Sequence, residues 1–415
     1  MASIMEYLDW RGDIPFSFDP FNEADNLLLC QIAYVHYENI VPGMDTDDTV
    51  SVCDAAKKYL ELHPTPRSEV RSGSVQLLQK MAQTVRFKDV RIGGYVSSFS
   101  REKDEQMSAV TFFLPDGTAY VSFRGTDNSL SGWKEDLNLS FLSDTPGQQH
   151  AAAYLSFYLK NTGCPLRVGG HSKGGNYAVY ASAFCDAGIK ERIQVIYNND
   201  GPGFLEDVLA RPEYQEIVPK VRSIIPEGSL FGLLLYHSYP HHIIKSTGKG
   251  LFQHDMMTWQ VLGSSLEAAP GLTQTSVFLE KTVRDWVENI NYEDRQAFVD
   301  SLFEILTSGG ADTLRELNQS SLKEKMDLFK SFREMDTRDQ KLFVQTFGDL
   351  LKSGWNTLYE GISETGKGLP SRLLGTGLEM LIPSKETKDA PQHMVKTKDV
   401  SNASEKEEKN GSDPV

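Results

Sequence analysis

The spacing of hydrophobic residues changes along the first part of the chain, from a helical to a strand-like pattern. Residues 26–37 carry apolar side chains around most of the helical circumference, which predicts a largely buried helix. Residues 107–114 and 118–123 have a strand-like pattern and flank Pro115-Asp-Gly117, and turn residues between two such runs indicate a β-hairpin. A helical N-terminal segment, residues 1–90, therefore precedes the start of a sheet.

Strands and helices alternate after the hairpin, as they do in a parallel sheet whose strands are joined by helices. We therefore predict the α/β class, with a largely parallel sheet and flanking helices in a domain over residues 1–265 that includes the helical N-terminal segment. The segments that follow the hairpin are a helix at 148–160, a strand just before Ser172, a helix ending near Ala187, strands at 193–198 and 221–225, and a weaker strand candidate at 242–245.

Beyond the break at Ala268-Ala-Pro-Gly271 the hydrophobic spacing is helical again. Ser321-x-x-Glu324 and Thr337-x-x-Gln340 have the form of capping boxes, which mark the starts of helices. We therefore predict a helical C-terminal region over residues 270–380. The last part of the chain has almost no apolar residues, which predicts a disordered tail at 384–415.

Composition narrows the classes of function. The chain has 415 residues and a formal net charge of −15, and without a basic stripe such a chain repels polyphosphate, so we exclude nucleic acid as a partner. The four cysteines follow no metal-binding spacing, so we expect reduced core thiols, no metal and no cofactor. No apolar run is long enough for a transmembrane segment, and the N-terminus lacks the basic start and apolar stretch of a signal peptide. We expect a cytoplasmic protein.

The strongest chemical signal is Gly170-x-Ser172-x-Gly174, which strand-like residues precede and a helical pattern follows. In this context the motif describes a nucleophile elbow, a sharp turn between strand and helix that exposes the serine Oγ. Both glycines have a steric reason, because a Cβ at either position would collide with the neighbouring strand or helix. We predict that Ser172 is a nucleophile.

A serine hydrolase also needs donors for the oxyanion, a histidine base and an acid that orients the histidine. In α/β-hydrolases the oxyanion loop precedes the serine, and the acid and the histidine follow it in that order. The strand that ends in Arg124-Gly-Thr126 breaks at its glycine, so the backbone N–H of Thr126 is one candidate donor. The N–H of Lys173, at the start of the helix after the serine, is the other.

His254 is the favoured base because it follows a loop after the last candidate strand, where this order places the histidine. His241 and His242 lie at the start of that strand, which is the wrong end of the sheet. The other histidines that precede the serine or lie in the tail are His36, His63, His150, His171 and His393, and His237 also follows the serine.

Two carboxylates are candidates for the acid. Asp200 follows the strand at 193–198, and Glu227 follows the strand at 221–225. We favour Asp200 and keep Glu227 as the alternative. Asp255 is set aside, because a side chain next to His254 in the chain points elsewhere.

Residues 121–137 and 169–178 resemble the lipase class 3 (fungal lipase-like) family, the first through Arg-Gly-Thr and Trp-x-x-Asp-Leu, the second through the elbow. Asn199-Asp-Gly-Pro-Gly-Phe204 and Gln253-His-Asp255 are similar to a bacterial branch of lipase-like α/β-hydrolases. The resemblance covers about residues 3–320. It implies an α/β-hydrolase that cleaves a small-molecule ester or a lipid, with Ser172 as nucleophile, Thr126 as oxyanion residue and His254 as base. Lys173 replaces the leucine usual in that family, which argues against a preference for long acyl chains.

Several alternatives stay open at this point. Lys173 either steers a carboxylate or phosphate group of a substrate towards Ser172, or is a solvated lysine whose stem covers apolar surface. A phosphate-binding loop is excluded, because its lysine follows a glycine and precedes Ser or Thr. The alternative function is a non-catalytic hydrolase-fold protein whose C-terminal helices bind a protein partner; in an enzyme the same helices cover the mouth of the site or bind a partner.

Overall fold

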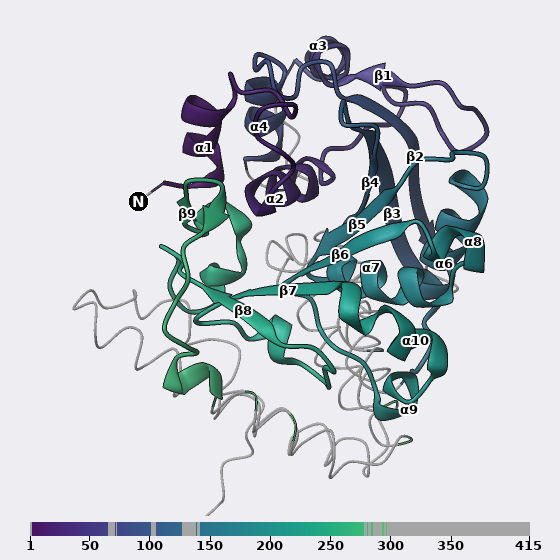
Figure 1. The fold of residues 1–415 in the computed structure, drawn as a ribbon, viewed down its shortest axis with the longest axis vertical. Helices are drawn as coiled ribbons and strands as arrows, with labels where there is room; N and C mark the ends of the chain where they lie inside the picture. Colours follow the sequence, from purple (N-terminus) through teal and green to yellow (C-terminus); the bar gives the residue numbers. More distant parts are fainter. Residues whose placement is uncertain are drawn as a thin grey trace, which may run out of the picture. The chain divides into compact units, whose positions relative to one another are not determined.

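The computed structural model describes residues 2–64, 71, 73–100, 105–126, 138 and 142–277, together with the single residues 280, 284, 293 and 296. An eight-stranded sheet follows the chain order from β1 to β8 (Figure 1). The strands pair antiparallel from β1 to β4 and parallel from β4 to β8, so the predicted α/β class is confirmed. Their bounds are β1 (Val50–Ser51), β2 (Arg91–Ser100), β3 (Glu105–Phe113), β4 (Ala119–Phe123), β5 (Leu166–His171), β6 (Ile193–Asn199), β7 (Val221–Pro226) and β8 (His241–Ile244), and a separate pair joins β9 (Val261–Leu262) to β10 (Ser265–Leu266).

The predicted β-hairpin is present between β3 and β4. Phe113 pairs with Ala119, and the Leu114 N–H donates to the Thr118 carbonyl at 2.8 Å. Gly117 has a φ of 81°, a left-handed conformation that glycine adopts without steric cost. The turn residues therefore fix the hairpin locally, as the sequence indicated.

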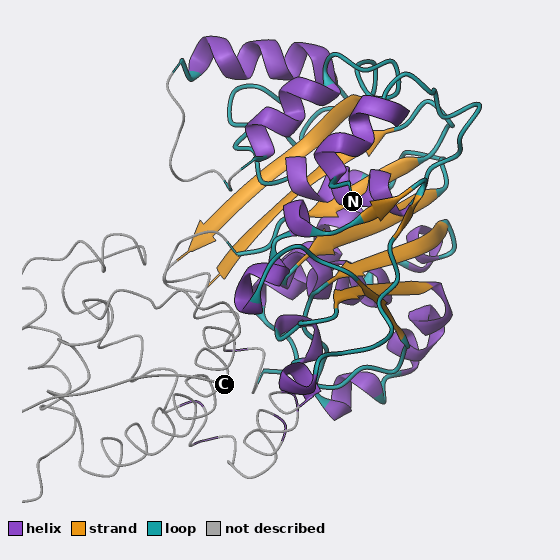
Figure 2. Cartoon of the chain, turned by 90° about the vertical axis from the view of Figure 1, so that its left-hand side faces the viewer, coloured by secondary structure: helices purple, strands orange, loops and turns teal. Residues whose placement is uncertain are grey.

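Helices cover both faces of the sheet (Figure 2). One core contains the N-terminal helices and Tyr120 of β4; the other contains α6, α7 and α10 and Val121 of the same strand. Successive residues of a strand point to opposite faces, so β4 contributes to both cores. The helices are α1 (Ile4–Arg11), α2 (Glu23–Ile32), α3 (Val52–Leu62), α4 (Ser74–Met81), α6 (Pro146–Tyr158), α7 (Lys173–Phe184), α8 (Ala187–Lys190), α9 (Glu206–Leu209) and α10 (Pro212–Ile217), with the 3₁₀ turns η1 (Val218–Lys220), η2 (Phe231–Leu233), η3 (Gly250–His254) and η4 (Met256–Thr258).

Buried polar contacts hold the N-terminal segment together and join it to the sheet. Within the segment, Asp25 of α2 and Arg86 form an ion pair in which both side chains are fully buried. Asn26 donates to the Asn199 side chain at 2.9 Å, and Asn199 donates to the Gly170 carbonyl at 3.0 Å. Because buried polar groups are stable only with partners, the two asparagine contacts hold α2 against the ends of β5 and β6.

Some predictions fall outside the part of the chain that the structure describes. These are the Trp-x-x-Asp-Leu segment, nearly all of the helical region at 270–380 and the whole tail at 384–415, and the proposed domain boundaries stay predictions. Among the described helices, none combines the length and the apolar composition needed to cross a bilayer. All four cysteines are free; Cys30 and Cys185 are buried, whereas Cys53 and Cys164 are half-buried, so the expectation of core thiols holds for two of them.

Candidate active site

Ser172 lies on the turn between β5 and α7 with a φ of 58° and a ψ of −133°. A positive φ is unfavourable for serine and persists only where the surrounding structure enforces it. A Cβ on Gly170 would lie 2.1 Å from the Gly174 carbonyl oxygen, and one on Gly174 would lie 2.2 Å from the Phe123 carbonyl oxygen. The steric reason predicted for both glycines is therefore confirmed, and the turn has the geometry of a nucleophile elbow.

The loop after β4 lies against the elbow. A Cβ on Gly125 would be 2.4 Å from the His171 carbonyl oxygen and 3.1 Å from the Ser172 Cβ. Arg124 is buried and not a surface arginine, and Thr126 follows as a half-buried residue. The structure thus brings the predicted oxyanion loop to the serine.

Lys173 opens α7, so its backbone N–H lies in the first turn of the helix, where the dipole favours negative charge. Its side chain is only 1% exposed, and the ammonium lies 5.7 Å from the centroid of the Tyr177 ring. The interpretation of Lys173 as a solvated lysine is therefore wrong. The stem and the terminal amino group are both inside the protein, next to the serine.

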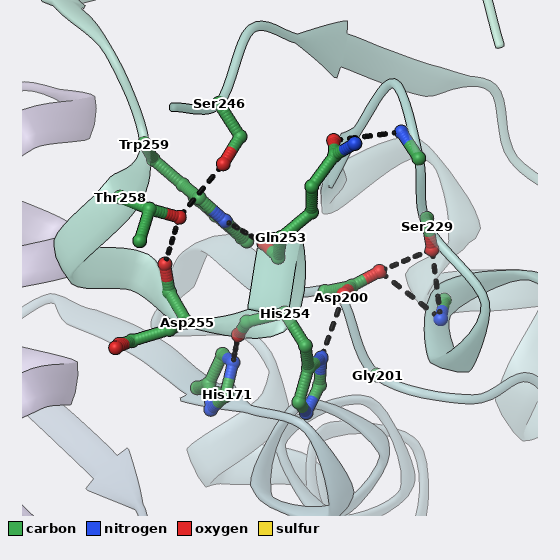
Figure 3. A network of polar contacts seen from close by, with 12 residues as sticks. His171, Asp200, Gly201, Ser229, Ser246, Gln253, His254, Asp255, Thr258 and Trp259 are labelled. Atoms are coloured by element: carbon green, nitrogen blue, oxygen red, sulfur yellow. Dashed lines mark hydrogen bonds and ion pairs between the residues drawn. The ribbon is translucent and has the colours of Figure 1, made fainter. Parts of the chain in front are cut away.

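His254 lies in η3 and Asp200 directly follows β6, and the two side chains face each other (Figure 3). The Nδ1 atom of His254 is 2.7 Å from Oδ2 of Asp200, whose side chain is fully buried, while that of His254 is 16% exposed. Within the described residues, no hydrogen bond joins His254 to the other candidate acid, Glu227. The structure therefore pairs the predicted base with Asp200.

The turn after β7 holds the Asp200 carboxylate from the other side. The Oδ1 atom of Asp200 accepts hydrogen bonds from the buried Ser229 hydroxyl and, at 3.1 Å, from the Gly232 N–H. In the same turn, the Phe231 ring packs on the His254 ring with 4.1 Å between centroids. From the sequence, Glu227 is the only residue of this turn with a predicted role, and Ser229 and Phe231 were not predicted to belong to the site. Serine and glycine in a turn give no local signal that they face a carboxylate from another loop.

Separate contacts fix the neighbours of His254 (Figure 3). The Gln253 side chain accepts a hydrogen bond from the Gly228 N–H at 2.9 Å. The backbone carbonyl of Gln253 accepts one from the buried Trp259 indole N–H at 2.7 Å. Asp255 accepts from the Met257 N–H at 3.1 Å, and its carboxylate lies 3.6 Å from Arg71. Asp255 thus faces away from the His254 ring, as expected.

Contacts between adjoining residues bring Ser172 and His254 close to one another. The ring centroids of His171 and His254 are 4.5 Å apart, and the Ser172 N–H donates to the Asn199 carbonyl at 3.0 Å, one residue before Asp200. In the described part of the chain, the Ser172 hydroxyl has no hydrogen bond to the His254 ring. In enzymes without substrate such bonds are often long and shorten in the Michaelis complex.

The remaining candidate histidines make other contacts. His241 Nδ1 is 2.8 Å from the Ser223 hydroxyl, and His242 Nδ1 is 3.5 Å from a Glu23 carboxylate oxygen. Burial lowers the pKa of His237 to about 3. Across the described residues, no three His, Cys, Asp or Glu side chains are grouped so that they could hold a metal ion.

Comparison with known proteins adds one match. Residues 81–304, more than half of the chain, match the model of the family described as Mbeg1-like. This is a lipase-like family of the fungal lipase class 3 superfamily. The matched range contains Ser172, Asp200 and His254. A search of the curated proteins found no match. The narrower bacterial branch inferred from the sequence stays a prediction.

Proposed function

This chain belongs to the Mbeg1-like family, and from that premise we propose that it is a serine hydrolase that cleaves carboxylic esters through an acyl-enzyme on Ser172. The observation that carries the proposal is the 2.7 Å contact between His254 Nδ1 and the buried Asp200 carboxylate. Asp200 follows the carboxyl end of β6, next to the end of β5 where the serine elbow begins. A nucleophile, a base and an orienting acid in this arrangement are the parts of a Ser-His-Asp triad.

The proposed reaction begins with proton transfer from the Ser172 hydroxyl to His254 Nε2, while Oγ attacks the ester carbonyl carbon. The Thr126 and Lys173 N–H groups stabilise the negative charge that develops on the carbonyl oxygen. His254 then gives the proton to the leaving alcohol, and an acyl-enzyme remains. Water, activated by the same histidine, releases the acid and restores the serine.

Asp200 is the proposed acid of this triad. A carboxylate that accepts from His254 Nδ1 holds the proton on that atom, so the ring presents an unprotonated Nε2 to the serine. The hydrogen bonds from Ser229 and Gly232 fix the orientation of the carboxylate. Glu227 lacks such contacts to His254 among the described residues, which favours Asp200.

The proposed substrate is a small-molecule ester or a lipid, and the proposed location is the cytoplasm. The buried Lys173 next to the nucleophile, where class 3 lipases usually have leucine, argues against a preference for long acyl chains. The length and the head group that are accepted depend on the shape of the pocket.

The test is labelling of the folded chain by a fluorophosphonate probe, combined with hydrolysis of esters of increasing acyl length. We expect labelling and turnover by the wild-type protein and neither by Ser172→Ala, whereas Ser97→Ala, at an exposed position of β2, behaves as wild type. A folded wild-type chain that neither labels nor hydrolyses any of the esters refutes the proposal. That result favours the alternative, a hydrolase-fold binding module whose C-terminal helices bind a protein partner.

A further inference from the structure

His171, the residue before Ser172, is fully buried and uses both of its ring nitrogens. Its Nε2 lies 2.8 Å from the backbone carbonyl oxygen of His254. Its Nδ1 lies 2.9 Å from the Tyr34 hydroxyl and 3.3 Å from a guanidinium nitrogen of Arg71. A carbonyl only accepts and a guanidinium only donates, so the proton is on Nε2 and Nδ1 is the acceptor. The partners therefore assign a single neutral tautomer to this ring.

The surroundings of His171 keep the ring neutral. Burial, then the positive charge of Arg71 and the neighbouring His254 hold the pKa of His171 well below its usual value. Protonation would also remove the acceptor that Tyr34 and Arg71 require. The donor on Nε2 is thus available to the His254 carbonyl at neutral pH.

Arg71 contacts the same loop directly. Its second terminal nitrogen is 3.4 Å from the His254 carbonyl oxygen, and its guanidinium lies 3.6 Å from the Asp255 carboxylate and 5.0 Å from the centroid of the Tyr34 ring. Tyr34 follows α2 and Arg71 precedes α4, so both come from the N-terminal segment, before the first residue of the family match.

We propose that Tyr34, Arg71 and His171 are positioning residues that fix the backbone of His254 relative to Ser172. This inference rests on the proposed function. The hydrogen bond from His171 to the His254 carbonyl connects the residue adjoining the nucleophile with the residue that carries the base. Asp200 orients the imidazole ring of His254, whereas these three side chains fix the chain from which that ring extends.

The geometry gives the size of the expected effect. In the proposed reaction the serine proton moves to His254 Nε2, so the rate depends on the distance between these two residues. A misplacement of about 1 Å in such a pair lowers the rate about 100-fold. Loss of the donor on His171 is therefore expected to lower kcat and to leave KM nearly unchanged, because none of the three side chains is proposed to touch the ester.

The experiment compares two substitutions at one position. Glutamine can place an amide N–H near the position of the ring Nε2, whereas phenylalanine keeps the ring shape and has no donor. For His171→Phe we expect a kcat about 10- to 100-fold below wild type with a KM within about threefold, and for His171→Gln a kcat restored to within about fivefold. Arg71→Ala is expected to lower kcat by about three- to tenfold, against no change for Arg222→Ala, an exposed arginine of β7.

Each variant is checked by thermal unfolding, and fluorophosphonate labelling rates are measured beside turnover. If His171→Phe does not fold, Tyr34→Phe and Arg71→Ala still test the inference, because each removes one partner of the ring. Folded His171→Phe with wild-type kcat, or His171→Gln no better than His171→Phe, overturns the inference and leaves the proposed function standing.

A structural readout separates this inference from the proposed function. The ¹⁵N imidazole spectrum of the full chain is expected to show His171 protonated on Nε2 and unprotonated on Nδ1 at pH 7. A wild-type chain with that spectrum but without turnover or labelling refutes the proposed function and, with it, the catalytic role of these residues. A protonated Nδ1 overturns the assigned contacts whatever the activity.

Discussion

Replacing Asp200 by asparagine is expected to lower kcat/KM by about 10²- to 10⁴-fold, or about 3–5.5 kcal/mol of transition-state stabilisation. The reason lies in the contacts of the carboxylate. Oδ1 accepts from the Ser229 hydroxyl and the Gly232 N–H, so an asparagine keeps its carbonyl oxygen on that side. Its NH₂ group then faces His254 Nδ1, which has to become an acceptor. The ring proton moves to Nε2, the atom that must take the proton of Ser172.

The assay is steady-state hydrolysis of a short-chain nitrophenyl ester, with the fluorophosphonate labelling rate as a second measure of Ser172 reactivity. The matched control is Glu227→Gln, for which we expect activity within about twofold of wild type because its carboxylate does not contact the base. Thermal unfolding of both variants separates a catalytic from a folding effect. Retention of more than about a third of the wild-type kcat/KM by Asp200→Asn, or an equal loss of activity in both variants, would refute the assignment of Asp200 as the acid.

Three further predictions concern the elbow, the acid and the effect of pH. Gly170→Ala places a Cβ 2.1 Å from the Gly174 carbonyl oxygen, so we expect a loss of about 3 kcal/mol or more in urea unfolding, and wild-type stability would contradict the steric argument. Ser229→Ala removes a donor to Asp200 and is expected to lower kcat by about 3- to 30-fold in steady-state kinetics, while an unchanged kcat would show that this bond does not orient the acid. The pKa of His171 is depressed in the folded chain, so stability is full above the unfolded value of about 6.5 and falls below it by up to about 1.4 kcal/mol per pH unit. Urea unfolding from pH 7 to pH 5 should give a shallower dependence for His171→Gln, and equal slopes would count against a neutral buried ring.

The parts of the fold that the sequence predicted depend on contacts between near neighbours in the chain. The hairpin turn is encoded in Pro115-Asp-Gly117, and the elbow needs glycine at position 170 because a Cβ there would meet the carbonyl of Gly174, four residues further along the chain. His254 was favoured through the usual order of triad residues along the chain. The structure places it 2.7 Å from Asp200, the acid that was preferred over Glu227.

The parts that escaped prediction depend on residues far apart in the chain. Tyr34 and His171 are 137 positions apart, and no local pattern connects a tyrosine after a helix with a histidine in an elbow. The same holds for Arg71, which is 100 positions from His171. The burial of Lys173 was also not predicted, because a lysine at the start of a helix is usually solvated. Only the packing of the helix against its neighbours encloses this side chain.

The hydrogen bond between Asn26 and Asn199 has a consequence for how the chain is made. These residues are 173 positions apart, so at about 5–20 residues per second, their synthesis on the ribosome is separated by about 9–35 s. Throughout that interval the end of β6 does not yet exist, so Asn26 of α2 lacks its hydrogen-bond partner. The apolar side chains of α2 also have no complete sheet to pack against. Nascent chains that stop before β6 are therefore expected to be substrates for chaperones and proteases, and the serine turn, whose Ser172 N–H donates to the Asn199 carbonyl, also lacks this partner until β6 is made.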